Sequence, residues 1–93
     1  MLPKTVTSEQ LDRLFAALGY ELAPADGPQR VYVNREYDAI QVLPPTSQEA
    51  HARLIHLMTL RTISIGKGIV DEEGFDRLLC EVTRPAEMAD HAA

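Results

Sequence analysis

The side chains of this chain that could carry acid–base or metal chemistry are three histidines and two neighbouring carboxylates. His51 and His56 are five residues apart and so lie on different sides of a helix, and His91 is near the end of the chain. Helical metal pairs need histidines four residues apart, so we expect no metal site. Glu36 and Asp38 would point to the same side of an extended stretch, as paired catalytic carboxylates do, but we interpret them as solvated turn residues.

Two other patterns could serve nucleophilic or phosphate chemistry, and neither is complete. The serines Ser8, Ser47 and Ser64 have no adjacent histidine and no Gly-x-Ser-x-Gly turn that would activate a hydroxyl group. The segment 66–68, Gly-Lys-Gly, is shorter than a phosphate-binding loop and lacks the serine or threonine that follows such a loop. We interpret it as a helix stop, and the sequence predicts no catalytic residue and no cofactor.

One set of basic and aromatic residues could contact RNA. Arg30 and Arg35 lie on either side of Tyr32, whose ring could stack on a base, and these three residues form the candidate RNA surface. Acidic residues are interspersed among them, so charge pairing on a solvated sheet face explains the same residues without a ligand.

Composition narrows the class of protein. The chain has 93 residues, 45% of them hydrophobic, and a formal net charge of -5, which is typical of one small folded domain. This charge repels phosphate backbones and anionic membranes, so nucleic acid is disfavoured and a membrane partner is not expected. The start of the chain lacks an apolar signal core, which predicts a cytoplasmic location. The single cysteine, Cys80, lies in an apolar run and is predicted to be buried.

The spacing of apolar residues predicts a first helix that begins near Ser8. Thr7 and Gln10 fit a capping box, and Gly19 can adopt the left-handed conformation that ends a helix. One apolar face recurs at helical spacing through Leu11, Leu14, Phe15 and Leu18.

Three short strands are predicted next. Residues 20–23 form the first, and a turn rich in proline and glycine separates it from two runs in which Val31 and Val33, then Ile40 and Val42, alternate with polar or aromatic residues. This pattern predicts a three-stranded antiparallel meander with one apolar face, which ends at the prolines 44 and 45.

A second helix is predicted from about Thr46, where Glu49 would complete a second capping box, to about Ile65. It is apolar over more than half of its circumference, yet Arg61 falls inside its main apolar stripe. We favour a helix that breaks near Leu60, with 62–70 as a loop or strand. The alternative is a continuous helix in which Arg61 is half-buried and paired with a carboxylate such as Asp71, or reaches a ligand.

A last helix is predicted after Asp71, which can cap it, with an inward face of Phe75, Leu78, Leu79 and Val82. The tail 85–93 has no apolar period and is expected to be flexible. The predicted fold is therefore a single α+β domain over residues 1–84, an α-β-β-β-α meander followed by a short C-terminal helix.

The order of these elements resembles the HicA-like, or YcfA-like, toxins of toxin–antitoxin pairs. The resemblance covers about residues 8–70 and rests on Leu-Gly-Tyr-Glu-Leu at 18–22, a glycine turn, Val-Tyr-Val at 31–33, a second strand, proline and a helix. It implies a fold like that of double-stranded-RNA-binding domains. The family's catalytic histidine follows Gly-Ser at the start of the second strand, and here that stretch reads Gly-Pro-Gln-Arg at 27–30. The resemblance therefore implies no ribonuclease activity, because Gln29 cannot act as a general base.

These observations favour a non-catalytic protein-interaction domain, either a homo-oligomer or one half of a complex with a small partner. The candidate interaction surface is the apolar excess of the second helix, represented by Leu57, Met58, Leu60 and Arg61. The alternative is a HicA-like RNA-binding domain of toxin–antitoxin origin. An enzyme that uses Glu36, Asp38 or a histidine is the third and least favoured hypothesis.

Overall fold

The computed structural model of this chain describes residues 6–45 and 53–84. Its elements are, in chain order, α1 (Ser8–Ala17), β1 (Glu21–Ala23), β2 (Arg30–Asn34), β3 (Ala39–Leu43), α2 (Arg53–Gly66) and α3 (Glu72–Val82). This order confirms the predicted α+β fold, with one helix, a three-stranded sheet and two further helices. The predicted capping box at Thr46 and Glu49, the histidines His51 and His91, and the tail 85–93 lie outside the described residues.

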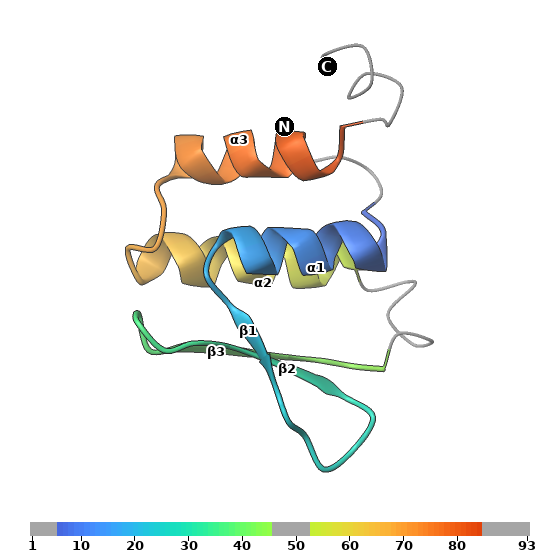
Figure 1. The fold of residues 1–93 in the computed structure, drawn as a ribbon. Helices are drawn as coiled ribbons and strands as arrows, with labels where there is room; N and C mark the ends of the chain where they lie inside the picture. The colour runs from blue at the N-terminus through green and yellow to red at the C-terminus, as the bar shows by residue number, and fades with distance from the viewer. Residues whose placement is uncertain (1–5, 46–52, 85–93) are drawn as a thin grey trace.

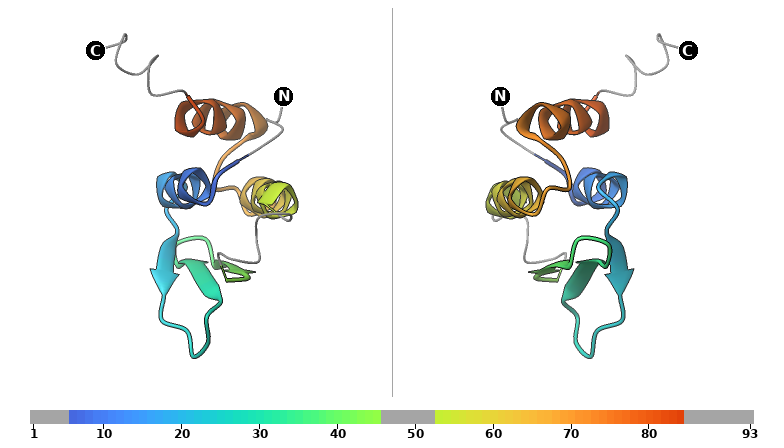
Figure 2. Two further views of the ribbon diagram at one scale, coloured as in Figure 1. Left: turned by 90° about the vertical axis from the view of Figure 1, so that its right-hand side faces the viewer. Right: turned by 90° about the vertical axis from the view of Figure 1, so that its left-hand side faces the viewer.

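The elements form three layers (Figures 1 and 2). The antiparallel sheet, with strand order β1-β2-β3, is at the bottom of Figure 1, α1 and α2 lie side by side above it, and α3 covers the two helices from the other side. The core fills the space between these layers. Its buried side chains are those of Val6, Leu11, Leu14, Phe15, Leu18, Tyr20, Tyr32, Ala39, Leu43, Leu57, Leu60, Phe75 and Leu79.

Helix α1 begins and ends as its sequence predicts. The Thr7 hydroxyl group accepts a hydrogen bond from the Gln10 N–H, and the Gln10 side chain accepts one from the Thr7 N–H, so the capping box is complete. At the other end Gly19 has φ +89°, and the Tyr20 N–H donates to the Phe15 carbonyl oxygen. This six-to-one bond across a left-handed glycine is the Schellman motif, which turns the chain toward β1.

Helix α2 is continuous from Arg53 to Gly66, so the favoured prediction of a break near Leu60 is wrong. Arg61 is half-buried, and its Nε lies 3.6 Å from Asp76 Oδ1 of α3 while its guanidinium group lies over the Phe75 ring. The alternative prediction of a paired, half-buried Arg61 is thus confirmed, with Asp76 as the carboxylate. Asp71 instead caps α3, because its Oδ1 accepts a hydrogen bond from the Gly74 N–H at 2.7 Å.

Helix α3 packs on both other helices through Phe75 and Leu79, which are fully or almost fully buried. Cys80, the next residue, points away from this contact and is exposed. The prediction that Cys80 is buried is therefore wrong, because the apolar run that contains it covers only one side of the helix.

The sheet turns its more polar face toward the helices. Arg30, Tyr32 and Asn34 of β2 and Gln41 of β3 point toward α1 and α2, where Tyr32, Asn34 and Gln41 are buried. The predicted apolar face, with Val31, Val33, Ile40 and Val42, is the one that points away from the helices. The helix-facing side also carries the core side chains of Ala39 and Leu43, so it mixes polar and apolar residues. Antiparallel sheets usually expose a polar face, whereas this sheet leaves an apolar one uncovered.

Candidate functional site

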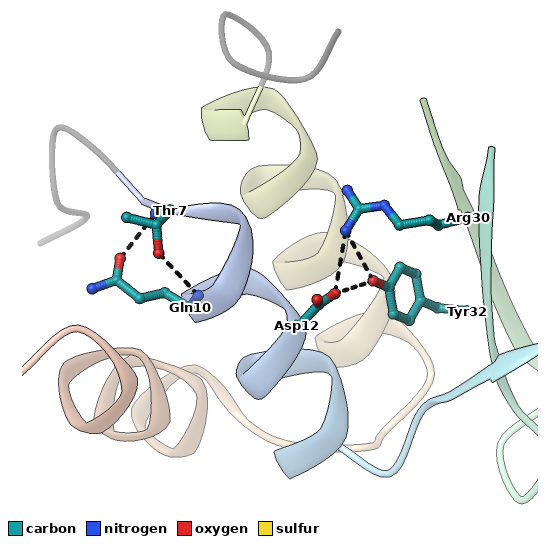
Figure 3. A network of polar contacts seen from close by, with 5 residues as sticks. All are labelled: Thr7, Gln10, Asp12, Arg30 and Tyr32. Atoms are coloured by element: carbon teal, nitrogen blue, oxygen red, sulfur yellow. Dashed lines mark hydrogen bonds and ion pairs between the residues drawn. The ribbon is translucent and has the colours of Figure 1, made fainter. Parts of the chain in front are cut away.

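Polar side chains on the inner face of the sheet connect it to α1 (Figure 3). The Tyr32 hydroxyl group donates a hydrogen bond to Asp12 Oδ1, and Arg30 Nη1 lies 3.3 Å from the same carboxylate oxygen and 3.2 Å from the Tyr32 oxygen. The Tyr32 ring stacks on Phe15, with 3.9 Å between ring centroids and 11° between ring planes. Tyr32 is thus fixed by an apolar contact on its ring and a polar contact at its end.

The surroundings of the Tyr32 hydroxyl group determine its protonation state. Burial, reinforced by the carboxylate of Asp12, raises the pKa of Tyr32 to about 12, although the cation of Arg30 acts in the opposite direction. The phenol is therefore protonated at neutral pH and serves as a hydrogen-bond donor to Asp12. It is unsuited to act as a nucleophile or a general base.

This arrangement bears directly on the candidate RNA surface. Tyr32 is 4% exposed and stacked on Phe15, so its ring has no face available for a nucleobase. Arg30 is on the same helix-facing side and is ion-paired with Asp12, whereas Arg35 is exposed at the turn between β2 and β3. The structure does not bring these three residues to one surface, and the prediction that they form one is wrong.

Two amides on the inner face connect the sheet to backbone carbonyl groups of the helices. Asn34 Nδ2 donates to the Leu18 carbonyl oxygen at 2.9 Å, and Gln41 Nε2 donates to the His56 carbonyl oxygen at 3.1 Å. Burial and the nearby cation of Arg30 lower the pKa of His56. His56 is therefore neutral at physiological pH and lies where α2 meets the sheet.

The four residues of the candidate interaction surface on α2 separate into two pairs. Leu57 and Leu60 are 0% exposed because this side of α2 faces the core, so the prediction that they form a contact surface is corrected. Met58 is 51% exposed. Arg61 reaches the surface in part, but its guanidinium group is paired with Asp76.

The exposed side of α2 carries a second stripe at helical spacing. Ile55, Met58, Thr59 and Thr62 lie opposite the buried stripe of Leu57, Leu60 and Ser64, with Ile55 65% exposed. These four residues, together with Ile63, line a shallow hollow. We call the surface formed by Ile55, Met58, Thr59 and Thr62 the lateral face. It carries no charged side chain.

The sequence contained the signal for this lateral face. Residues 55, 58, 59 and 62 follow the i, i+3, i+4, i+7 spacing that marks one side of a helix. The main stripe through Leu57 is more apolar and predicts the contact surface, so of the exposed stripe only Met58 belongs to the candidate interaction surface.

A second uncovered apolar surface lies on the sheet. Val31 pairs with Val42 and Val33 with Ile40 across β2 and β3, and Ile40 and Val42 are 59% and 58% exposed. We call the surface formed by these four side chains the outer face. No element of residues 6–45 or 53–84 covers it, as Figure 1 shows below the sheet.

The other residues whose side chains could take part in catalysis or ligand binding are spread over the molecule. Glu36 and Asp38 are exposed in the turn between β2 and β3. The segment 66–68 ends α2, with Gly68 at φ +78°. Over the described part of the chain, no three His, Cys, Asp or Glu side chains are grouped as a metal site would require.

Comparisons with protein-family models, with curated proteins and with solved structures gave no match. Within the described residues, no helix has the length and apolar character needed to cross a bilayer.

Proposed function

We propose that this chain is a non-catalytic protein-interaction module that self-associates through its uncovered apolar surfaces. The observation that carries the proposal is that two apolar surfaces stay uncovered in the described structure: the lateral face of α2, and the outer face of the sheet with Val31, Val33, Ile40 and Val42.

Exposed β-branched side chains on a sheet are costly in water, because each loses the favourable transfer of its apolar area, roughly 25 cal/mol for every Å². A contiguous set of such residues marks an interaction site more often than scattered single residues do. A domain of this size buries a modest fraction of its surface on folding, so association adds burial that the monomer lacks. The net charge of -5 keeps the free chain soluble.

Sedimentation equilibrium of the purified chain tests the proposal. From about 5 to 500 µM, the weight-average mass should rise from the monomer value of 10.3 kDa toward twice that value. The exposed helix residue Ala16 provides a control, since Ala16→Lys adds a charge on α1 that belongs to neither apolar surface and should leave the association constant unchanged. A mass of 10.3 kDa at every concentration would contradict the proposal.

RNA binding by a HicA-like domain is the less supported alternative. Its stacking residue Tyr32 is buried, Arg30 is ion-paired, and only Arg35 of the three is exposed. Fluorescence anisotropy with a labelled RNA duplex decides the matter. We expect no binding at physiological salt; salt-sensitive binding that Arg35→Glu abolishes and Ala16→Lys preserves would establish the alternative.

A further inference from the structure

We infer that the second molecule docks its lateral face against the lateral face of the first, so that two α2 helices pack antiparallel about a two-fold axis near Thr59 and Thr62. This inference rests on the proposed function and specifies which of the two uncovered surfaces forms the dimer.

The lateral face is self-complementary in shape. Its large side chains, Ile55 and Met58, are in the N-terminal half of α2, and its threonines, Thr59 and Thr62, follow toward the C-terminal end, where Gly66 continues the same helical spacing. A two-fold axis between Thr59 and Thr62 reverses this order in the second copy. Ile55 of each copy then lies opposite Gly66 of the other, where even an added Cβ atom would meet nothing within 4 Å. The threonines at the axis allow the helices to approach closely, as small residues do at helix crossings.

Charge also favours a second copy at this face. Each chain carries a net charge of -5, so two copies repel one another wherever acidic residues face each other. The lateral face has no charged residue, and α2 has no acidic residue in its first turn.

The outer face is less suited to a second copy. Glu21 of β1 pairs with Val33, so its exposed carboxylate borders this apolar surface. Two outer faces packed together would bring the carboxylates of two acidic chains to one apolar interface, and partly desolvated like charges are unfavourable there.

The size of the lateral face sets the strength of the dimer. One helix pair buries less than the roughly 1,200 Å² of total surface found at the lower limit of standard interfaces. We therefore expect a weak, reversible dimer that is populated at about 100 µM and dissociates on dilution.

Cysteine cross-linking and sedimentation together test the inference. The exposed Cys80 is first replaced in a Cys80→Ser background, and Thr59→Cys is introduced on the lateral face. A short bismaleimide should link two copies of this variant at least 10-fold more efficiently than copies of the control Glu73→Cys, which is exposed on α3. In parallel, Ile55→Lys should weaken the wild-type association at least 10-fold, whereas Ile40→Lys on the outer face should leave it within 2-fold. Circular dichroism confirms that both exposed-site variants are folded.

The outcomes separate the two proposals. Cross-linking through Thr59→Cys and loss of association in Ile55→Lys support the lateral-face dimer. A wild-type dimer that persists in Ile55→Lys and dissociates in Ile40→Lys would overturn this inference while leaving the proposed self-association intact. A chain that stays monomeric at every concentration and is not cross-linked above the Glu73→Cys control would overturn both.

Discussion

At the scale of single residues, Tyr32 joins a stacked ring and a hydrogen-bonded hydroxyl group, and substitutions can separate the two contributions. Tyr32→Phe keeps the stack on Phe15 and removes the hydroxyl group, which donates to Asp12 and accepts from Arg30. We expect it to lower the free energy of unfolding by about 1 kcal/mol, since Asp12 is half-exposed and water can replace the lost donor. Tyr32→Ala also removes the buried ring and should cost about 3–5 kcal/mol.

Urea denaturation of both variants measures these values. Equal losses in Tyr32→Phe and Tyr32→Ala would mean that the hydroxyl group, rather than the stacked ring, holds β2 against α1.

His56 should make the stability of the fold depend on pH. Its pKa is lowered from 6.5 in the folded state by burial and by Arg30, so the unfolded chain binds the proton more readily. The sign follows from this difference: the contribution is fully present above pH 6.5 and is lost as pH falls below 6.5 through the folded pKa. The groups near His56 are the cation of Arg30 and the amide of Gln41, which donates to the His56 carbonyl oxygen.

Urea midpoints of the wild type and of His56→Gln between pH 7.5 and 5 test this prediction. The wild type should lose more stability than His56→Gln over this range. Parallel pH profiles would show that other groups are responsible.

At the scale of elements, two glycines that end helices provide a matched pair. Gly19 after α1 and Gly68 after α2 both have positive φ, but only at Gly19 would an added Cβ atom crowd a neighbour, Asn34 Nδ2 at 3.2 Å. Gly68→Ala should cost about 1–2 kcal/mol from the left-handed backbone alone. Gly19→Ala should cost more, because it also displaces the amide that bonds to the Leu18 carbonyl oxygen. Thermal unfolding of the two variants compares these costs, and equal losses would show that the Asn34 contact adds nothing.

The elements themselves could largely be predicted, because their signals are local. The capping box of Thr7 and Gln10 and the glycine stop at Gly19 involve residues within a few positions of one another. The continuation of α2 past Leu60 could not be predicted in this way. The carboxylate that pairs with Arg61 is Asp76 of a different helix, and a window of sequence around Arg61 shows only a charge in an apolar stripe.

Local sequence pattern also could not predict which face of the sheet packs against the helices. Alternation within β2 and β3 correctly separated Val31, Val33, Ile40 and Val42 from the residues between them. Which set faces the helices is decided by distant partners: Phe15 and Asp12 for Tyr32, and backbone carbonyl groups for the two amides. The prediction that Leu57 and Leu60 of α2 form a contact surface was wrong for a related reason. The most apolar stripe of a helix usually packs into the core of its own domain.

At the scale of the whole molecule, the three layers leave the sheet with one covered side, and strand β3 can report on both of its faces. Leu43 is fully buried and Ile40 and Val42 are exposed. The pair Ile40→Thr and Val42→Thr keeps β-branched residues on the outer face while it removes apolar area. We expect it to change the free energy of unfolding by less than about 0.5 kcal/mol. Leu43→Ala, in the same strand, should cost about 2–5 kcal/mol.

Denaturation of the threonine pair at several protein concentrations also tests whether a second molecule covers the outer face. If the threonine pair destabilises the chain by more than about 2 kcal/mol at 100 µM but not at 1 µM, the outer face is covered by another molecule at the higher concentration. Such a result would move the dimer contact from α2 to the sheet, because a linked equilibrium stabilises the fold only where the partner binds. Equal values at both concentrations are expected for a dimer that uses the lateral face, where the charge-free stripe around Thr59 and Thr62 is untouched by substitutions in β3.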